Sequence, residues 1–244
     1  PVVGRLLDEP GAPPRGACYL LGKVWNTNHE PDRVRAACDR ALAAFGVDRL
    51  DGFALHWPEA WAHAGPLDGL RGLSHAERER LTFPRDDDGE IRTADVDLAT
   101  TWRAMEGLVD RGLVRHLGLC NVDRETLVGL CERARRPPAF VQVEHHPYEP
   151  ATDLLGACRE RGVRVIGHTP LGPDGLLAEP AVTGAADAHG VAPAQIVLRR
   201  AVERGVVPIP STTSRARLVE NLDLFGFALD PAERDRIDGL AGAA

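Results

Sequence analysis

Apolar runs and helix-period stretches alternate along the whole of this 244-residue chain. Short apolar runs that end in polar or aromatic residues are typical of buried strands in a parallel sheet. Between them, apolar residues recur at spacings of three and four, which is typical of amphipathic helices. The pattern therefore predicts repeated βα units. The predicted strands span residues 17–24, 50–55, 114–119, 139–143, 163–167 and 206–209.

Local signals mark where the helices between these strands begin. Pro31 and Pro193 suit a first helical turn, where a missing N–H breaks no hydrogen bond. Asp123 is a good N-cap, and Asp230 with Glu233 has capping-box spacing. The predicted helices start near Pro31, Asp123, Pro193 and Asp230, and others cover about 98–110, 153–161 and 214–224. Residues 59–96 are predicted to form a long functional loop.

The strand ends carry the residues that suggest chemistry, which favours a (β/α)8 TIM barrel seen at its C-terminal face. We expect a single α/β domain over residues 1–244. A closed barrel of this type has eight strands, so about six are in this sequence and we expect the first two to precede Pro1. An open doubly wound sheet would also fit six strands, but no G-x-G-x-x-G follows any of them.

Charge and composition narrow the class of protein. The net charge is −7, and no basic stripe is interleaved with aromatic residues, so we expect no nucleic-acid partner. No apolar run approaches the ~20 residues of a membrane span, and no signal peptide is recognisable. The five cysteines are odd in number and not closely paired. This favours a reducing compartment, and we expect a cytoplasmic protein.

Lys23 is the only lysine in a chain that otherwise uses arginine. A guanidinium does not give up its proton in a protein, whereas an ammonium shifts its pKa readily and acts as a compact point charge. Lys23 ends an apolar run and is followed by Val24, Trp25 and Asn26. Lys23 therefore either has a chemical role that arginine could not fill, or it is a lysine retained by chance in an arginine-rich sequence.

Seven motifs, in order along the chain, resemble those of the aldo-keto reductase family. The resemblance runs from about Val2 to Leu240. The motifs are Val3-Gly4; Gly22-Lys23-Val24-Trp25-Asn26-Thr27; Leu55-His56-Trp57-Pro58; Gly118-Leu119-Cys120-Asn121; Gln142-Val143-Glu144-His145-His146-Pro147-Tyr148; Thr169-Pro170-Leu171-Gly172; and Ile209-Pro210 with Arg217, Glu220 and Asn221.

The resemblance implies an eight-stranded barrel that reduces an aldehyde or ketone with NADP(H). It implies that Lys23 lowers the pKa of a proton-donating tyrosine. The ordinary tyrosine pKa of about 10 is too high for efficient proton transfer at neutral pH. It also implies that His56 positions the carbonyl and that Trp25 and Trp57 line the substrate pocket. Trp61 and Phe83, in the long loop, either join this aromatic wall or serve only in packing. The cofactor-binding residues that it implies are Cys120, Asn121, Gln142, His168, Thr169, Leu171, Gly172, Pro210, Ser211, Thr212, Arg217, Glu220 and Asn221.

The sequence also departs from the family pattern. The family's catalytic tyrosine and aspartate have no counterpart, since neither Tyr19 nor Tyr148 matches, and we expect both in a segment before Pro1. Cys120 replaces a serine, and His168 replaces a tyrosine that stacks on the nicotinamide. Ser211 replaces a lysine at the 2′-phosphate, whereas Arg217 is retained. We therefore expect a weakened preference for NADP.

Two alternative functions remain open at this point. Without its proton donor, the barrel could be an inert or repurposed NADP-binding protein, such as a scaffold or a cyclase-type partner. A metal-dependent barrel hydrolase would use His56, His146 and His168 near the strand ends, although no H-x-H or H-E-x-x-H spacing occurs. We expect no metal, a small-molecule carbonyl substrate, and a monomer or dimer.

Overall fold

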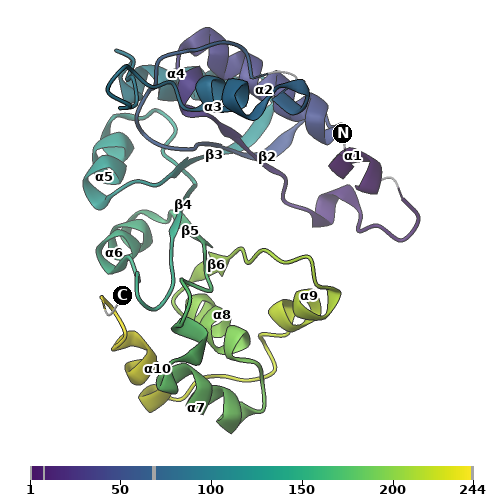
Figure 1. Cartoon of the computed structure of the whole chain (residues 1–244), viewed down its shortest axis with the longest axis vertical. Helices are drawn as coiled ribbons and strands as arrows, with labels where there is room; N and C mark the ends of the chain where they lie inside the picture. The colour runs from purple at the N-terminus through teal and green to yellow at the C-terminus, as the bar shows by residue number, and fades with distance from the viewer. Residues whose placement is uncertain (1, 8, 68–69, 243–244) are drawn as a thin grey trace. The chain divides into compact units, whose positions relative to one another are not determined.

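The computed structural model describes residues 2–7, 9–67 and 70–242 and divides into two units between Ala139 and Phe140. Each unit contains three parallel strands with helices beside them (Figure 1). The predicted α/β class and the six predicted strands are therefore confirmed for the described residues.

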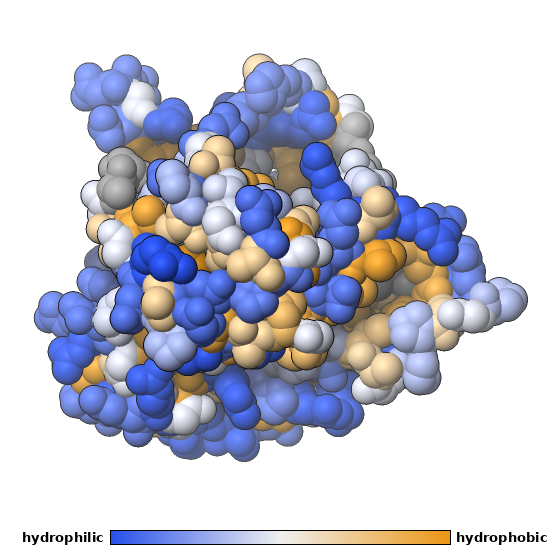
Figure 2. All heavy atoms as spheres, turned by 90° about the horizontal axis from the view of Figure 1, so that it is seen from below, coloured by the Kyte–Doolittle hydropathy of each residue, from blue (hydrophilic) through white to orange (hydrophobic). Residues whose placement is uncertain are grey.

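Polar residues cover most of the face drawn in Figure 2, and hydrophobic residues form small patches between them. Among the described residues, no helix is both long enough and apolar enough to cross a membrane.

In the first unit, β1 (Leu21–Val24), β2 (Leu50–Leu55) and β3 (Val114–Cys120) pair in chain order. Every residue of the central strand β2 is buried, which explains its almost continuous apolar sequence. β1 begins at Leu21 rather than at the predicted Ala17, which belongs to a 3₁₀ turn formed by Arg15–Ala17. The prolines that precede this turn cannot donate to a strand ladder.

The first unit also contains α1 (Val2–Leu7), α2 (Pro31–Phe45), α4 (Leu98–Asp110) and α5 (Arg124–Arg133). The predicted N-cap Asp123 accepts a hydrogen bond from the Thr126 N–H at 2.8 Å. Helix α4 buries Trp102, which is 1% exposed and donates from Nε1 to the Arg136 carbonyl at 3.0 Å. Thr101, Trp102, Met105 and Leu108 are buried along α4 at spacings of three and four, and Glu106 is buried beside them.

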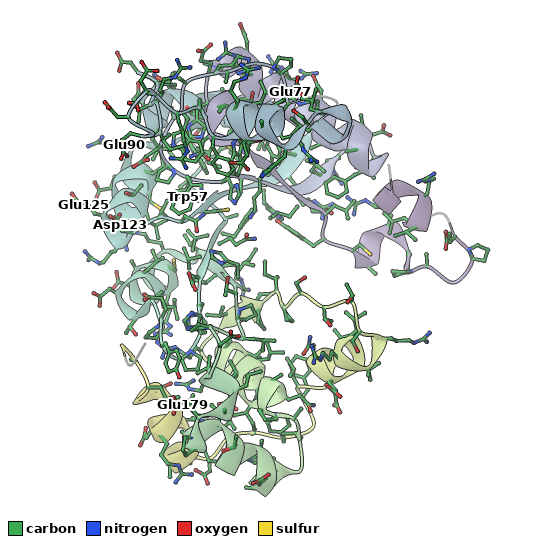
Figure 3. The ribbon with its side chains drawn as sticks, in the orientation of Figure 1. Trp57, Glu77, Glu90, Asp123, Glu125 and Glu179 are labelled. Atoms are coloured by element: carbon green, nitrogen blue, oxygen red, sulfur yellow. The ribbon has the colours of Figure 1, made fainter. Side chains whose placement is uncertain are left out.

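The long segment 59–96 is more ordered than a simple loop. It contains α3 (His75–Thr82), which begins with a capping box between Ser74 and Glu77 (Figure 3). Antiparallel bridges join Trp61 to Thr93 and Arg85 to Ile91. The S-x-x-E signal of α3 was present in the sequence, but the helix has few apolar residues and so lacks the periodic pattern.

In the second unit, β4 (Phe140–Glu144), β5 (Arg164–His168) and β6 (Val206–Pro208) pair in chain order. The predicted boundaries differ from these by at most one residue, as is usual at element ends. The helices are α6 (Thr152–Arg161), α7 (Pro180–His189), α8 (Pro193–Glu203), α9 (Arg215–Leu222) and α10 (Pro231–Asp238).

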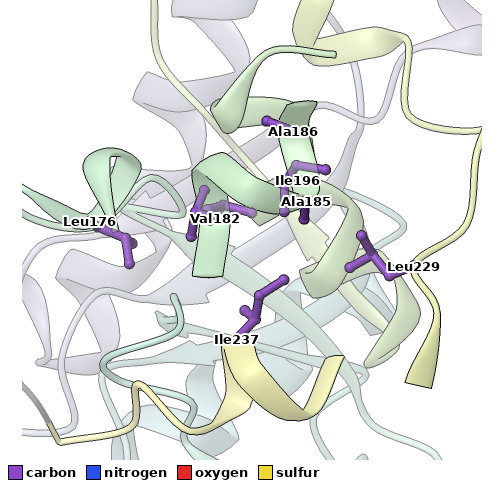
Figure 4. Packing of buried hydrophobic residues seen from close by; sticks show 8 residues of the cluster. Leu176, Val182, Ala185, Ala186, Ile196, Leu229 and Ile237 are labelled. Carbon is purple, nitrogen blue, oxygen red and sulfur yellow. The ribbon is translucent and has the colours of Figure 1, made fainter. Parts of the chain in front are cut away.

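Helices α7, α8 and α10 enclose a hydrophobic cluster in the second unit (Figure 4). Ala185 and Ala186 of α7 allow the larger side chains of Ile196, Leu229 and Ile237 to fill the space. α7 was not predicted as a separate helix. Its buried face is made largely of alanines, which give a weak hydrophobic signal.

Candidate active site

Lys23 lies one residue before the end of β1, and its side chain is half-buried. Because side chains alternate along a strand, it lies on the face opposite to the buried Val24. Lys23 pairs with Ala54 of β2, and Ala54 pairs with Gly118 of β3, so small residues leave room beside the ammonium. Burial raises the pKa of the Cys120 thiol to about 11, and the Lys23 charge opposes this shift. Lys23 and Cys120 are therefore neighbours on one face of the sheet.

His56 and Asn121 follow the ends of β2 and β3. The His56 N–H donates to the Val24 carbonyl at 3.0 Å, and the His56 carbonyl accepts from Asn121 Nδ2 at 2.8 Å. Asn121 has a φ of 54°, in the left-handed region that asparagine tolerates better than most residues. The imidazole centroid lies 4.8 Å from the Trp25 ring centroid. Three consecutive strand ends thus bring four predicted site residues together: Lys23, Trp25, His56 and Asn121.

Three aromatic residues form a cluster next to His56. The Trp25 ring centroid lies 5.7 Å from that of Trp61 and 5.5 Å from that of Phe83, both with edge-to-face geometry. Trp25 Nε1 donates to the Thr82 carbonyl at 2.8 Å, which fixes the indole against the end of α3. Trp57 is instead 44% exposed (Figure 3). The aromatic cluster therefore consists of Trp25, Trp61 and Phe83.

In the second unit, Gln142 and His168 lie on β4 and β5. Gln142 is 3% exposed, so its amide is held inside the unit. His168 ends β5, pairs with Glu144, and has Nδ1 3.0 Å from the Thr169 hydroxyl. Thr169 has a φ of 51°, which is strained for a β-branched residue. Such strain concentrates at ligand sites and active sites.

A tight turn follows Thr169. The Gly172 N–H donates to the Thr169 carbonyl at 2.9 Å, and Leu171 lies inside the turn, half-buried. Gly172 has a φ of 64°, and a Cβ atom there would lie 2.5 Å from Leu176 Cδ2. The turn therefore requires glycine, and it presents backbone groups at the end of β5.

The remaining predicted cofactor residues lie after β6. The Ser214 N–H donates to Thr212 Oγ1 at 3.1 Å, and Ser214 Oγ accepts from the Arg217 N–H at 3.4 Å, which caps α9. Ser211 and the Arg217 side chain are exposed, so the guanidinium is available to an anionic ligand. The other predicted residues of this segment are Pro210, Glu220 and Asn221.

Comparison with known proteins identifies the family. The model of the Aldo/keto reductase family matches residues 1–241. The chain belongs to this family. Aldo-keto reductase family 1 member A1 from Cricetulus griseus is 37% identical over 252 residues, which cover 98% of this chain and 73% of the relative. The Homo sapiens protein of the same name is 35% identical over 254 residues, with 98% and 74% covered.

Solved structures agree with this assignment. The aldose reductase from Schistosoma japonicum has a TM-score of 0.87 at 30% identity, covering 98% of this chain and 75% of that structure. The aldose reductase from Giardia lamblia has a TM-score of 0.85 at 28% identity, covering 98% and 78%. The chain is therefore an aldo-keto reductase of the (β/α)8 class, an oxidoreductase that reduces small carbonyl compounds with a nicotinamide cofactor.

Neither Tyr19 nor Tyr148 has the environment of a proton donor. Burial, assisted by Asp51, raises the pKa of Tyr19 to about 12, and its hydroxyl lies 3.1 Å from His116 Nδ1. Tyr148 donates to Glu179 at 2.6 Å, and this hydrogen bond raises its pKa (Figure 3). A phenol that gives up its proton near neutral pH needs its pKa lowered.

Sequence reasoning missed a polar pair at the end of β4. His146 Nε2 lies 3.0 Å from Glu144 Oε1, and His146 Nδ1 accepts the Glu149 N–H at 3.2 Å. Because Nδ1 is an acceptor, Nε2 carries the proton and donates to Glu144. The E-x-H spacing at a strand end was the available signal. Among the described residues, no group of three or more His, Cys, Asp or Glu residues is placed to hold a metal.

Proposed function

We propose that Lys23 and His56 are the catalytic residues of this carbonyl reductase and that NADPH is its preferred cofactor. When bound, the nicotinamide supplies the hydride. The half-buried Lys23 ammonium lowers the pKa of the proton-donating phenol through its positive charge, and His56 hydrogen-bonds the substrate carbonyl oxygen. The observation that supports this most is the convergence of Lys23, His56 and Asn121 at three adjacent strand ends.

The residues proposed to hold the cofactor fit a nicotinamide. Asn121 and Gln142 offer amide groups that match a carboxamide, and Gln142 is buried, as a positioning residue should be. Asn121 and Thr169 have left-handed backbones, which is the kind of strain that ligand sites retain. We propose that His168 stacks on the ring and that Thr169, Leu171 and Gly172 contact the rest of the cofactor, as Cys120 contacts the carboxamide.

We propose that Arg217 recognises the 2′-phosphate, together with Pro210, Ser211 and Thr212, while Glu220 and Asn221 contact the adenine. The exposed guanidinium can form a paired hydrogen bond with phosphate, and Ser211 adds only a neutral hydroxyl. Arg217→Gln should therefore weaken NADPH binding about tenfold and leave NADH binding unchanged. Arg215→Gln, on the same helix, is the matched control. Equal loss for both cofactors would remove Arg217 from this role.

The substrate side of the site is proposed to be aromatic. Trp25, with Trp61 and Phe83 behind it, offers a rigid apolar wall beside His56. Trp57 adds an exposed indole to the rim. These features suit a small carbonyl compound with an apolar substituent. We further propose that residues 1–244 belong to one barrel domain, acting as a monomer or dimer in the cytoplasm.

The proton is proposed to come from a tyrosine outside residues 1–244. This is supported by the raised pKa values of Tyr19 and Tyr148, which are opposite to what the reaction needs. Tyr19→Phe and Tyr148→Phe should therefore both keep the carbonyl reductase activity of the full-length protein. Loss of activity in either variant, with folding intact, would assign the proton to that residue.

The deciding experiment is NADPH oxidation by the full-length protein with a panel of aldehydes, ketones and quinones. Wild type should reduce members of the panel, and Lys23→Arg should not, because a guanidinium has a different shape and hydration from an ammonium. NADPH binding, measured by fluorescence titration, should be nearly the same in both proteins. If Lys23→Arg reduces carbonyls as fast as wild type, Lys23 is not the residue that tunes the phenol.

A further inference from the structure

A cavity lies in the first unit, at the strand ends opposite to those that carry Lys23, His56 and Asn121. Its volume is about 460 Å³, and its charged lining residues are Arg15, Asp48, Arg49, Asp51 and Arg115. Asp51 and Arg115 are the second residues of β2 and β3, so the cavity lies at the amino ends of these strands. Lys23, His56 and Asn121 lie at or after the carboxyl ends. The cavity is therefore separate from the candidate active site.

One arginine of this cavity is fixed by a buried carboxylate. Asp51 is 6% exposed and accepts the Leu20 N–H at 2.9 Å and Arg15 Nη2 at 2.8 Å. Arg15 also donates to the Cys18 carbonyl at 2.9 Å and to the Arg49 carbonyl at 3.1 Å. Arg15 is thus held in one orientation, and its charge is balanced by Asp51.

The other two arginines are not balanced in this way. Arg115 Nη1 lies 3.7 Å from Asp51 Oδ1, beyond hydrogen-bond distance, and its side chain is 51% exposed. Arg49 is exposed, and the described residues give its side chain no ion-pair partner. Asp48 is exposed on the same loop and offsets one charge at most. Three guanidiniums against one buried and one exposed carboxylate leave the cavity positive, and among the described residues the Arg49 and Arg115 side chains have no hydrogen-bond acceptor.

We propose that this cavity binds the phosphate group of a small molecule. Guanidinium groups recognise phosphate through paired, charge-assisted hydrogen bonds. The guanidinium N–H groups of Arg49 and Arg115 are the donors available for this. The volume is within the range of small-ligand sites and leaves room for an organic group beyond the phosphate. Neither a metal ion nor a cationic ligand suits the site, because Asp51, the one buried carboxylate among the described residues that line the cavity, is already paired with Arg15.

Calorimetric titration of the full-length protein with inorganic phosphate tests the proposal, using chloride at matched ionic strength as the reference. The test variant is Arg49→Gln with Arg115→Gln, two exposed positions whose change should leave the fold intact. Arg217→Gln separates this cavity from the proposed 2′-phosphate site, which inorganic phosphate can also occupy. Arg33→Gln, at a half-buried arginine of α2 that is paired with Glu30, controls for the loss of positive charge. Glycerol 3-phosphate then shows whether an organic group is accepted.

Wild type, Arg33→Gln and Arg217→Gln should retain a saturable phosphate site that chloride does not reproduce. The double variant should bind phosphate at this site about tenfold more weakly or worse, because it loses two charged donors. The proposal is overturned if binding disappears in Arg217→Gln alone, if the double variant binds like wild type, or if chloride reproduces the whole effect. In those cases the arginines serve only to stabilise the strand ends. Carbonyl reduction by the double variant is measured separately, and its result does not decide whether the cavity binds phosphate.

Discussion

The hydrogen bond from Asn121 to His56 offers a test that separates two contributions to stability. Asn121→Ala removes the Nδ2 donor, which lies 2.8 Å from the His56 carbonyl. The loss of one partly buried hydrogen bond costs about 1 kcal/mol. Alanine must also adopt the φ of 54°, which costs about 1 kcal/mol more. We therefore expect Asn121→Ala to lower the free energy of unfolding by about 2 kcal/mol.

Asn121→Gly is the matched variant. Glycine also lacks the amide but adopts the left-handed conformation freely, so the expected loss is about 1 kcal/mol. Urea unfolding followed by circular dichroism measures both values. Both variants should lose affinity for the nicotinamide cofactor to a similar degree, since both lack the amide. Equal destabilisation by alanine and glycine would show that the backbone conformation contributes nothing and that our reasoning is wrong.

Three further predictions concern stability. Trp102→Phe should cost about 2 kcal/mol in urea unfolding, because it removes the hydrogen bond to Arg136 and leaves a void; an unchanged midpoint would contradict this. Gly172→Ala should cost more than about 1 kcal/mol and weaken cofactor binding, because its Cβ would meet Leu176; a stability gain would refute the turn geometry. Burial lowers the pKa of His29 to about 4. Between about pH 6.5 and 4 the unfolded chain therefore binds a proton on His29 that the folded protein does not, so His29 lowers the stability as the pH falls. We expect the free energy of unfolding that is lost between pH 7 and pH 5 to be about 2 kcal/mol smaller in His29→Leu than in wild type.

The sequence located the strands because their signal is local. Every residue of Leu50–Leu55 is buried, so its apolar run and its strand boundaries coincide. Asp123 was likewise identified correctly, because an N-cap depends on residues three positions apart. The helix Pro180–His189 was missed because alanines bury little apolar area each.

From the sequence, only the site residues at the ends of predicted strands could be placed together. Parallel pairing in register brings Lys23, His56 and Asn121 to one edge, and this follows from the order of the strands. Whether a tryptophan packs or remains exposed depends on long-range contacts, and so Trp61 joins the cluster while Trp57 does not. The arginine-lined cavity depends on the turn at Arg15 and on the loop before β2, neither of which has a sequence signature.

The buried Cys120 thiol has a consequence for an enzyme that handles electrophiles. Aldehydes and quinones alkylate thiolates much faster than thiols, and peroxides oxidise the same form. With a pKa of about 11, only about one molecule in every ten thousand carries a thiolate at neutral pH. The Cys120 sulfur should thus resist both covalent inactivation by reactive compounds and oxidation by peroxides.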